Sequence, residues 1–202
     1  GDPALRLLAR AGRVTPTDLA AYQASGGGAA LRRAAELGPD GVIQEIAAAR
    51  LVGRGGAAFP AAKKWQAVRD QLARPRYLVC NADESEPGTF KDRVLLEHDP
   101  FAVLEGMIIA AGATGCAHGY IYLRGEYPLA AARLERALDE ARRAGWLGAG
   151  FDVEIDPRGS LGGTSSGTLV ASKAWADQAP ERTLKVLARM RVERDAVADM
   201  DY

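Results

Sequence analysis

The sequence predicts an α/β fold whose sheet is at least partly parallel. Short apolar segments with the length and composition of buried strands occur at 76–80, 119–124 and 151–155. Segments with helical spacing of apolar residues separate them, at 90–97, 100–113 and 128–144. Strands that alternate with helices pair in parallel through helical crossovers, so this order favours a sheet with helices packed against it.

The segment before the first strand reads as helical. Helices are expected over 4–11, 19–24, 29–37, 41–50 and 61–72. The run Thr15-Pro16-Thr17-Asp18 is typical of a helix start, with Thr15 or Thr17 as the capping residue. The chain then divides into a helical lead-in (1–50), an α/β domain (51–157) and a linker with a divergent helical tail (158–202).

Composition excludes several classes of function. Lys and Arg number 26 and Asp and Glu also number 26, a balance that argues against general nucleic-acid or membrane-surface binding. The two cysteines form no disulfide framework, which favours a reducing, cytoplasmic location. The longest apolar run, 107–115, is too short to cross a bilayer, and His98 and His118 lack the spacing of metal ligands.

Two polar turns stand out from this ordinary composition. A glycine turn at 53–60 carries one fixed positive charge, Arg54, and an acidic turn at 81–86 follows the first predicted strand. Glycines let backbone N–H groups approach a ligand, whereas clustered carboxylates repel each other unless a partner meets them. Ligands of open α/β sheets bind at the carboxyl ends of the strands, where the acidic turn is expected. We therefore expect the Arg54 turn and the acidic turn to form one pocket wall.

Plainer interpretations exist for both turns. Gly53-x-Gly55-x-x-Ala58 formally matches a dinucleotide-binding fingerprint, but the preceding segment reads as a helix and not as the strand that this motif requires. A simple turn between two helices would also account for the glycines. The acidic turn could be a hydrated surface loop, although Pro87-Gly88 after it predicts a fixed turn.

Five segments of the chain together resemble a known family. They are GRGGAAFP (53–60), YLVCNADESEPGTFKDR (77–93), EGMIIA (105–110), GYIYLRGEYP (119–128) and ARRAGWLG (141–148). They are similar to the NADH-binding flavoprotein subunit of respiratory complex I and to the diaphorase subunits of NAD-reducing hydrogenases and NAD-dependent formate dehydrogenases. The resemblance covers about residues 1–157 and implies a Rossmann-like sheet that binds FMN.

The resemblance also implies roles for individual residues. An FMN would lie between the two turns, with NADH on its exposed face. Positions that match the family's flavin-binding residues are Gly53, Arg54, Gly55, Gly56, Lys64, Asn81, Asp83, Glu84 and Glu86. Phe59 matches an aromatic residue that contacts NADH, and Glu86 lies near the nicotinamide, at the catalytic position. Hydride would pass from NADH to FMN, and electrons would continue to iron–sulfur centres of partner subunits in a multi-subunit complex. If that complex is membrane-associated, the resemblance implies that this chain belongs to its cytoplasmic arm.

The last part of the chain leaves alternatives open. Residues 160–202 do not resemble the family, and two cysteines cannot supply the four thiolates of the family's four-iron cluster, so no cluster is expected in this chain. The alternative function is that of a non-catalytic, truncated or divergent paralogue that serves as an assembly or interface subunit. The chain could also be one part of a longer product.

Overall fold

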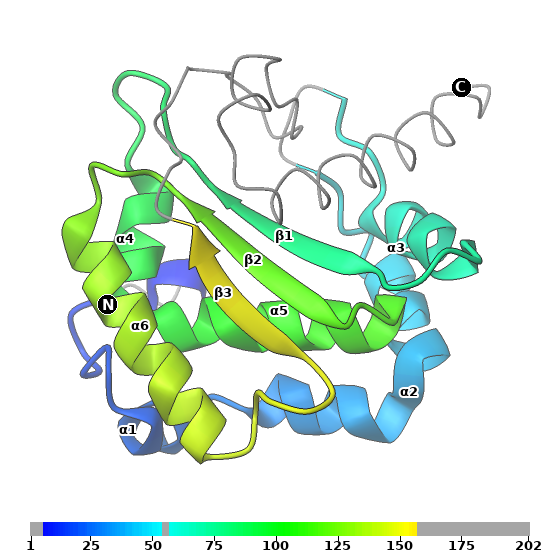
Figure 1. The fold of residues 1–202 in the computed structure, drawn as a ribbon, viewed down its shortest axis with the longest axis horizontal. Coiled ribbons are helices and arrows are strands. Elements are labelled where there is room, and N and C mark those ends of the chain that lie inside the picture. Colours follow the sequence, from blue (N-terminus) through cyan, green and yellow to red (C-terminus); the bar gives the residue numbers. More distant parts are fainter. Residues whose placement is uncertain (1–5, 54–56, 157–202) are drawn as a thin grey trace.

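The computed structural model describes residues 6–53 and 57–156 (Figure 1). Its centre is a three-stranded sheet of β1 (Tyr77–Ala82), β2 (His118–Leu123) and β3 (Asp152–Asp156), in the order β1-β2-β3. Both strand pairs are parallel, with Tyr77 opposite His118 and His118 opposite Asp152. The predicted α/β fold with a parallel sheet is therefore confirmed.

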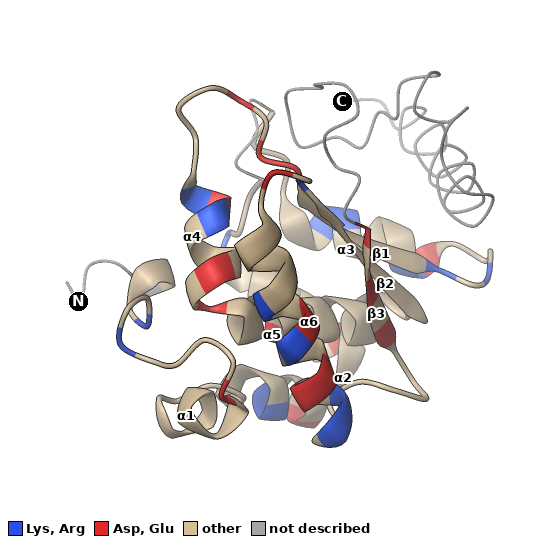
Figure 2. Cartoon of the chain, turned by 60° about the vertical axis from the view of Figure 1, so that its left-hand side comes forward, with Lys and Arg blue, Asp and Glu red and all other residues tan. Residues whose placement is uncertain are grey.

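The helical crossovers cover one side of this sheet. The chain passes from β1 to β2 through α4 (Lys91–His98) and α5 (Pro100–Thr114), and from β2 to β3 through α6 (Pro128–Arg143). Figure 2 shows all three helices on the same side of the strands. The alternate strand residues that face them are fully buried, among them Ile121, Leu123 and Val153. Burial of these apolar side chains against α5 and α6 fixes the register of the strands, because a one-residue slip would turn them to the other face.

Local sequence explains where α5 and α6 begin and end. Both start with a proline in the first turn, where no intrahelical N–H is needed. Helix α5 ends at Thr114. The next residue, Gly115, has a φ of 70° in the left-handed region, and the N–H groups of Gly115 and Cys116 both donate to the Ala111 carbonyl. In α6 most apolar residues lie on one face, which packs into the core beside the sheet, and Leu134 is completely inaccessible, whereas Leu129 is exposed.

The helical lead-in contains a 3₁₀ turn (Arg6–Leu8), α1 (Leu19–Ala24) and α2 (Ala29–Ala48), and α3 (Ala61–Asp70) follows the glycine turn. The predicted cap of α1 was wrong. The side chain of Asp18, and not that of Thr15 or Thr17, accepts a hydrogen bond from the Ala21 N–H at 2.9 Å. A carboxylate at this position also suits the positive end of the helix dipole.

Other boundaries shift by a few residues for reasons visible in the structure. The two helices predicted over 29–37 and 41–50 are the two halves of α2, which is kinked at Gly38 with φ 67°. Helix α3 ends at Asp70, earlier than predicted, because Gln71 is extended and its carbonyl accepts a hydrogen bond from the Arg76 guanidinium at 2.6 Å. Strand β1 continues to Ala82, so Asn81 belongs to the strand and not to the turn.

The lead-in packs on the same core as the sheet. Tyr22 of α1 is buried beside Phe101 of α5, with ring centroids 5.5 Å apart. Val42 and Ile43 of α2 pack with Ala113 of α5 in a second apolar cluster. Among the described residues, no helix combines the length and the apolar character needed to cross a membrane. The division into three domains remains a prediction.

Candidate functional site

The acidic loop, residues 83–90, leaves the carboxyl end of β1 and returns to the chain at α4. Asn81 is exposed, and its side-chain oxygen accepts a hydrogen bond from the Asp83 N–H at 3.1 Å. The Asp83 carboxylate is half-buried and accepts a hydrogen bond from the Ser85 hydroxyl at 2.6 Å. These local bonds give the start of the loop a defined direction, as polar residues in turns commonly do.

Glu86 occupies the tip of the same loop. Its side chain is exposed, and its backbone carbonyl accepts hydrogen bonds from the Thr89 N–H at 3.2 Å and the Thr89 hydroxyl at 2.6 Å. Gly88 has a φ of 83°, so the turn predicted from Pro87-Gly88 is present. Figure 2 shows acidic residues along this loop at the upper end of the molecule. Of the three loop acids, Glu86 is the one most open to a ligand.

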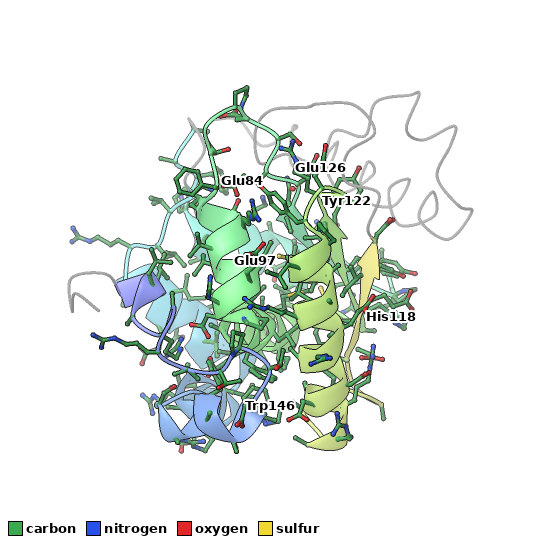
Figure 3. The ribbon with its side chains drawn as sticks, turned by 90° about the vertical axis from the view of Figure 1, so that its left-hand side faces the viewer. Glu84, Glu97, His118, Tyr122, Glu126 and Trp146 are labelled. Carbon is green, nitrogen blue, oxygen red and sulfur yellow. The ribbon has the colours of Figure 1, made fainter. Side chains whose placement is uncertain are left out.

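Glu84 lies at the base of the loop and points inward (Figure 3). Its side chain is only 2% exposed. One carboxylate oxygen accepts from the Asp92 N–H and the other from the Arg93 N–H, each at 3.1 Å. Burial by itself would raise the pKa of Glu84, but these two N–H groups, with Lys91 nearby, hold that pKa below its usual value. Glu84 therefore stays ionised and joins the loop to the first turn of α4.

The glycine turn is closed by backbone contacts at both ends. Val52 and Pro60 form an antiparallel bridge, and the Gly53 N–H donates to the Phe59 carbonyl at 2.8 Å. Ala58 has a φ of 45°, a left-handed conformation that is uncommon for a residue with a Cβ. The helical segment before the turn is α2, so the prediction that no strand precedes the glycines is confirmed, and the dinucleotide fingerprint lacks its structural context.

The remaining predicted residues around this turn are accessible to different degrees. Phe59 is half-buried, whereas Lys64 is exposed in the first turn of α3. Arg54, Gly55 and Gly56 lie outside the described residues. In Figure 1 the acidic loop lies at the upper left, and the flanks of the glycine turn lie at the upper right, above α3. A shared pocket wall, and contact between Arg54 and the loop acids, stay predictions.

Sequence reasoning assigned no role to two residues that hold the acidic loop. Arg124 directly follows β2, and its guanidinium donates to the backbone carbonyl of Glu84 and to Glu126, the latter at 2.8 Å. The buried Tyr127 places its hydroxyl 3.3 Å from the Glu84 carboxylate. The position of Arg124 directly after a buried strand could have indicated its role. Residues that follow neighbouring parallel strands lie close together at the carboxyl edge of the sheet.

The face of the sheet that points away from α5 and α6 carries three polar residues at this edge. Asn81, Tyr122 and Asp156 are register partners on neighbouring strands, so their side chains project from the same face. Tyr122 is half-buried and Asp156 is buried. Within residues 6–53 and 57–156, no group of three or more His, Cys, Asp or Glu residues could hold a metal ion.

Comparison with known proteins matches this chain to one family. Residues 46–175 match the family described as the Nuo51 FMN-binding domain. The match extends past residue 157, the limit that the sequence motifs suggested, so the prediction that residues 160–202 share nothing with the family was too strict.

Similar proteins come from two kinds of complex. An NADH-quinone oxidoreductase subunit of Aquifex aeolicus (strain VF5) is 46% identical over 154 residues, which are 74% of this chain and 36% of that protein. An NADH-quinone oxidoreductase subunit of Rhizobium meliloti (strain 1021) is 47% identical over 66% of this chain and 32% of that protein. The alpha subunit of the NAD-reducing hydrogenase HoxS of Cupriavidus necator is 52% identical over 59% of this chain and 21% of that protein.

A solved structure supports the same relationship. The crystal structure of an NAD⁺-reducing [NiFe]-hydrogenase in the air-oxidised state aligns with a TM-score of 0.53 and 45% identity, covering 58% of this chain and 20% of that one. The chain thus spans about a third or less of the length of these relatives. Because the family match covers more than half of its residues, the chain belongs to the Nuo51 FMN-binding domain family.

Proposed function

We propose that the chain binds FMN and, with it, oxidises NADH as part of a diaphorase-type flavoprotein subunit. The main support is that two loop carboxylates, Asp83 and Glu86, are accessible at the carboxyl end of a parallel strand in a member of an FMN-binding family. Mutually repelling carboxylates are costly unless they meet hydrogen-bond donors. Sugar and ribityl hydroxyls are such donors, and carboxylates accept from them strongly.

The residues present fit the two halves of a flavin nucleotide. Asn81, Asp83 and Glu86 offer oxygen acceptors on the β1 side. Lys64 offers an exposed ammonium group that suits a phosphate. We assign Arg54, Gly55 and Gly56 to the phosphate and flavin on the basis of the family resemblance.

Each group of the chain would then act by binding and orientation. When FMN is bound, it supplies the redox chemistry, which takes two electrons from a hydride donor and releases them one at a time. Asp83 and Asn81 would fix hydroxyls of the flavin side chain, and Gly53 would allow close approach of the backbone. Glu86 would accept hydrogen bonds at the nicotinamide side, and Phe59 would offer its ring to NADH.

The reduced flavin that this reaction would form needs a protein partner that accepts its electrons. Electrons that leave one at a time need an acceptor such as an iron–sulfur centre. We therefore propose that an iron–sulfur subunit of a larger, cytoplasmic complex receives the electrons. The named relatives support a complex of the NADH-quinone oxidoreductase or NAD-reducing hydrogenase type.

Titration of the full chain with FMN tests the proposal. We expect quenching of flavin fluorescence on binding, weaker quenching with riboflavin, which lacks the phosphate, and NADH-dependent reduction of ferricyanide by the loaded protein. Glu86→Gln should lower kcat/KM for NADH, while the exposed Glu135→Gln on α6 should not. Absence of both FMN binding and activity would refute the proposal and favour a non-catalytic assembly subunit.

A further inference from the structure

We propose that Arg124 is a positioning residue that sets the direction of the acidic loop. It acts together with Glu84 and Tyr127, and we call these three residues the loop clamp. The inference rests on the proposed function, because it concerns how Asp83 and Glu86 are presented to FMN. It also assigns Glu84 an indirect role: the family resemblance makes Glu84 a flavin contact, whereas its contacts in this chain point to the scaffold.

Glu84 has little capacity left for a ligand. Its side chain is 2% exposed, and each carboxylate oxygen already accepts a backbone N–H from the first turn of α4. Negative charge is favourable at the positive end of a helix, so the carboxylate is held there by charge as well as by hydrogen bonds. A hydroxyl of a ligand would have to displace these bonds inside a buried site. The two neighbouring acids, Asp83 and Glu86, have accessible carboxylates instead.

Arg124 holds the same residue from the other side. Its backbone N–H extends the β1–β2 ladder by donating to the Ala82 carbonyl at 3.2 Å. Its guanidinium donates to the Glu84 carbonyl, and its Nε donates to Glu126 at 2.8 Å. A planar guanidinium presents these donors in a fixed relation, so Arg124 ties the first residues of the loop to the end of β2.

Tyr127 completes the clamp between two cations. Its ring lies 5.7 Å from the Arg124 guanidinium and 5.5 Å from that of Arg93. Both distances are within the range of cation–π attraction. Its hydroxyl lies 3.3 Å from the Glu84 carboxylate, and the ring is buried. The loop is therefore braced on β2, on α4 and on the start of α6, while the exposed side chain of Glu86 extends from its tip.

The test compares Arg124→Gln with a matched arginine, Arg142, in the last turn of α6. Arg142 also donates to a carboxylate and to a carbonyl, namely Asp152 at 3.0 Å and Val153 at 2.7 Å, but at the start of β3. Arg142→Gln thus removes similar bonds at the opposite end of the strands. The measurements on the full chain are the FMN dissociation constant from fluorescence quenching and the hydrogen-exchange rate of the peptide over residues 82–93, each alongside the melting temperature.

We expect Arg124→Gln to raise the FMN dissociation constant roughly tenfold, because a tenfold change corresponds to the loss of about one hydrogen bond to a charged group. We also expect it to speed hydrogen exchange of the loop peptide. Arg142→Gln should do neither, at a comparable loss of melting temperature. Arg124→Lys should recover only part of the affinity, because one ammonium group cannot replace the planar fork. If Arg124→Gln fails to fold, Tyr127→Phe decides, since it removes only the hydroxyl and should also speed exchange.

Unchanged exchange of the loop peptide in the clamp variants would overturn the inference. So would an FMN dissociation constant that changes equally in Arg124→Gln and Arg142→Gln. If the wild-type chain binds no FMN, the proposed function fails, and the exchange rates still decide separately whether the clamp holds the loop.

Discussion

Replacement of Glu105 by Ala should detach the helical lead-in from the sheet domain. Glu105 of α5 is buried and accepts three hydrogen bonds: from the Tyr22 hydroxyl at 2.6 Å, the Gly28 N–H at 2.8 Å and the Leu31 N–H at 2.9 Å. Its carboxylate therefore serves α1 and also caps the first turn of α2. Burial and the Glu105 carboxylate both raise the pKa of Tyr22, which keeps the phenol protonated as the donor.

The magnitude follows from the donors that Glu105→Ala would leave unpaired. The Tyr22 hydroxyl and the Gly28 N–H are buried, and an orphaned buried donor costs about 1–3 kcal/mol, so the pair costs about 2–6 kcal/mol. That is a large fraction of the stability of a typical domain, about 5–15 kcal/mol. Tyr22→Phe removes one of these bonds and should cost about 1–2 kcal/mol.

Urea denaturation followed by circular dichroism and tryptophan fluorescence measures both effects. Glu36→Ala is the control, because Glu36 is exposed on α2, 3.7 Å from Arg33, and its loss should change stability by less than about 0.5 kcal/mol. A Glu105→Ala protein as stable as the control would refute the reasoning. A transition in two phases would show that the lead-in unfolds apart from residues 51–157, which is the domain division predicted from the sequence.

Three further predictions concern the scaffold around the site. Gly115→Ala should destabilise the fold by about 2–4 kcal/mol, because Gly115 has a φ of +70° and a Cβ there would lie 2.7 Å from Nη1 of the buried Arg76. The control is Gly145→Ala, where φ is +73° but the space around the new Cβ is open. In the same denaturation experiments this variant should cost only about 1 kcal/mol. The pKa of Glu84 is lower in the folded protein, so the unfolded chain binds a proton at Glu84 more readily. The stability that Glu84 contributes is therefore complete above pH 4.5 and is lost as the pH falls below that value. The unfolding free energy of Glu84→Gln should vary less with acid pH than that of the wild type, and equal slopes would contradict the contacts described. Burial raises the pKa of the Cys80 thiol to about 11, and the Asp92 carboxylate contributes to this shift. In a Cys116→Ser background, Cys80 should therefore react with a disulfide reagent at about pH 8 far more slowly in the folded protein than in denaturant. Equal rates would show an accessible thiol.

Local sequence was informative wherever a chemical rule acts over a few residues. Prolines at the starts of α5 and α6, Gly115 after α5 and Gly38 within α2 all mark boundaries through backbone constraints that need no distant partner. The cap of α1 was misassigned because three neighbouring residues, Thr15, Thr17 and Asp18, are all good capping types, and only the path of the chain selects among them.

The sequence by itself determined an α/β chain with a parallel sheet and an acidic turn at the end of the first strand, because hydrophobic period and turn chemistry are local properties. The direction of each acid in that turn was decided by tertiary structure. Glu84 points inward because α4 offers it two N–H groups and because Arg124, forty residues away in the chain, holds its carbonyl. Contacts between residues so far apart in the chain depend on how the helices cross the sheet, and no pattern of neighbouring residues encodes them.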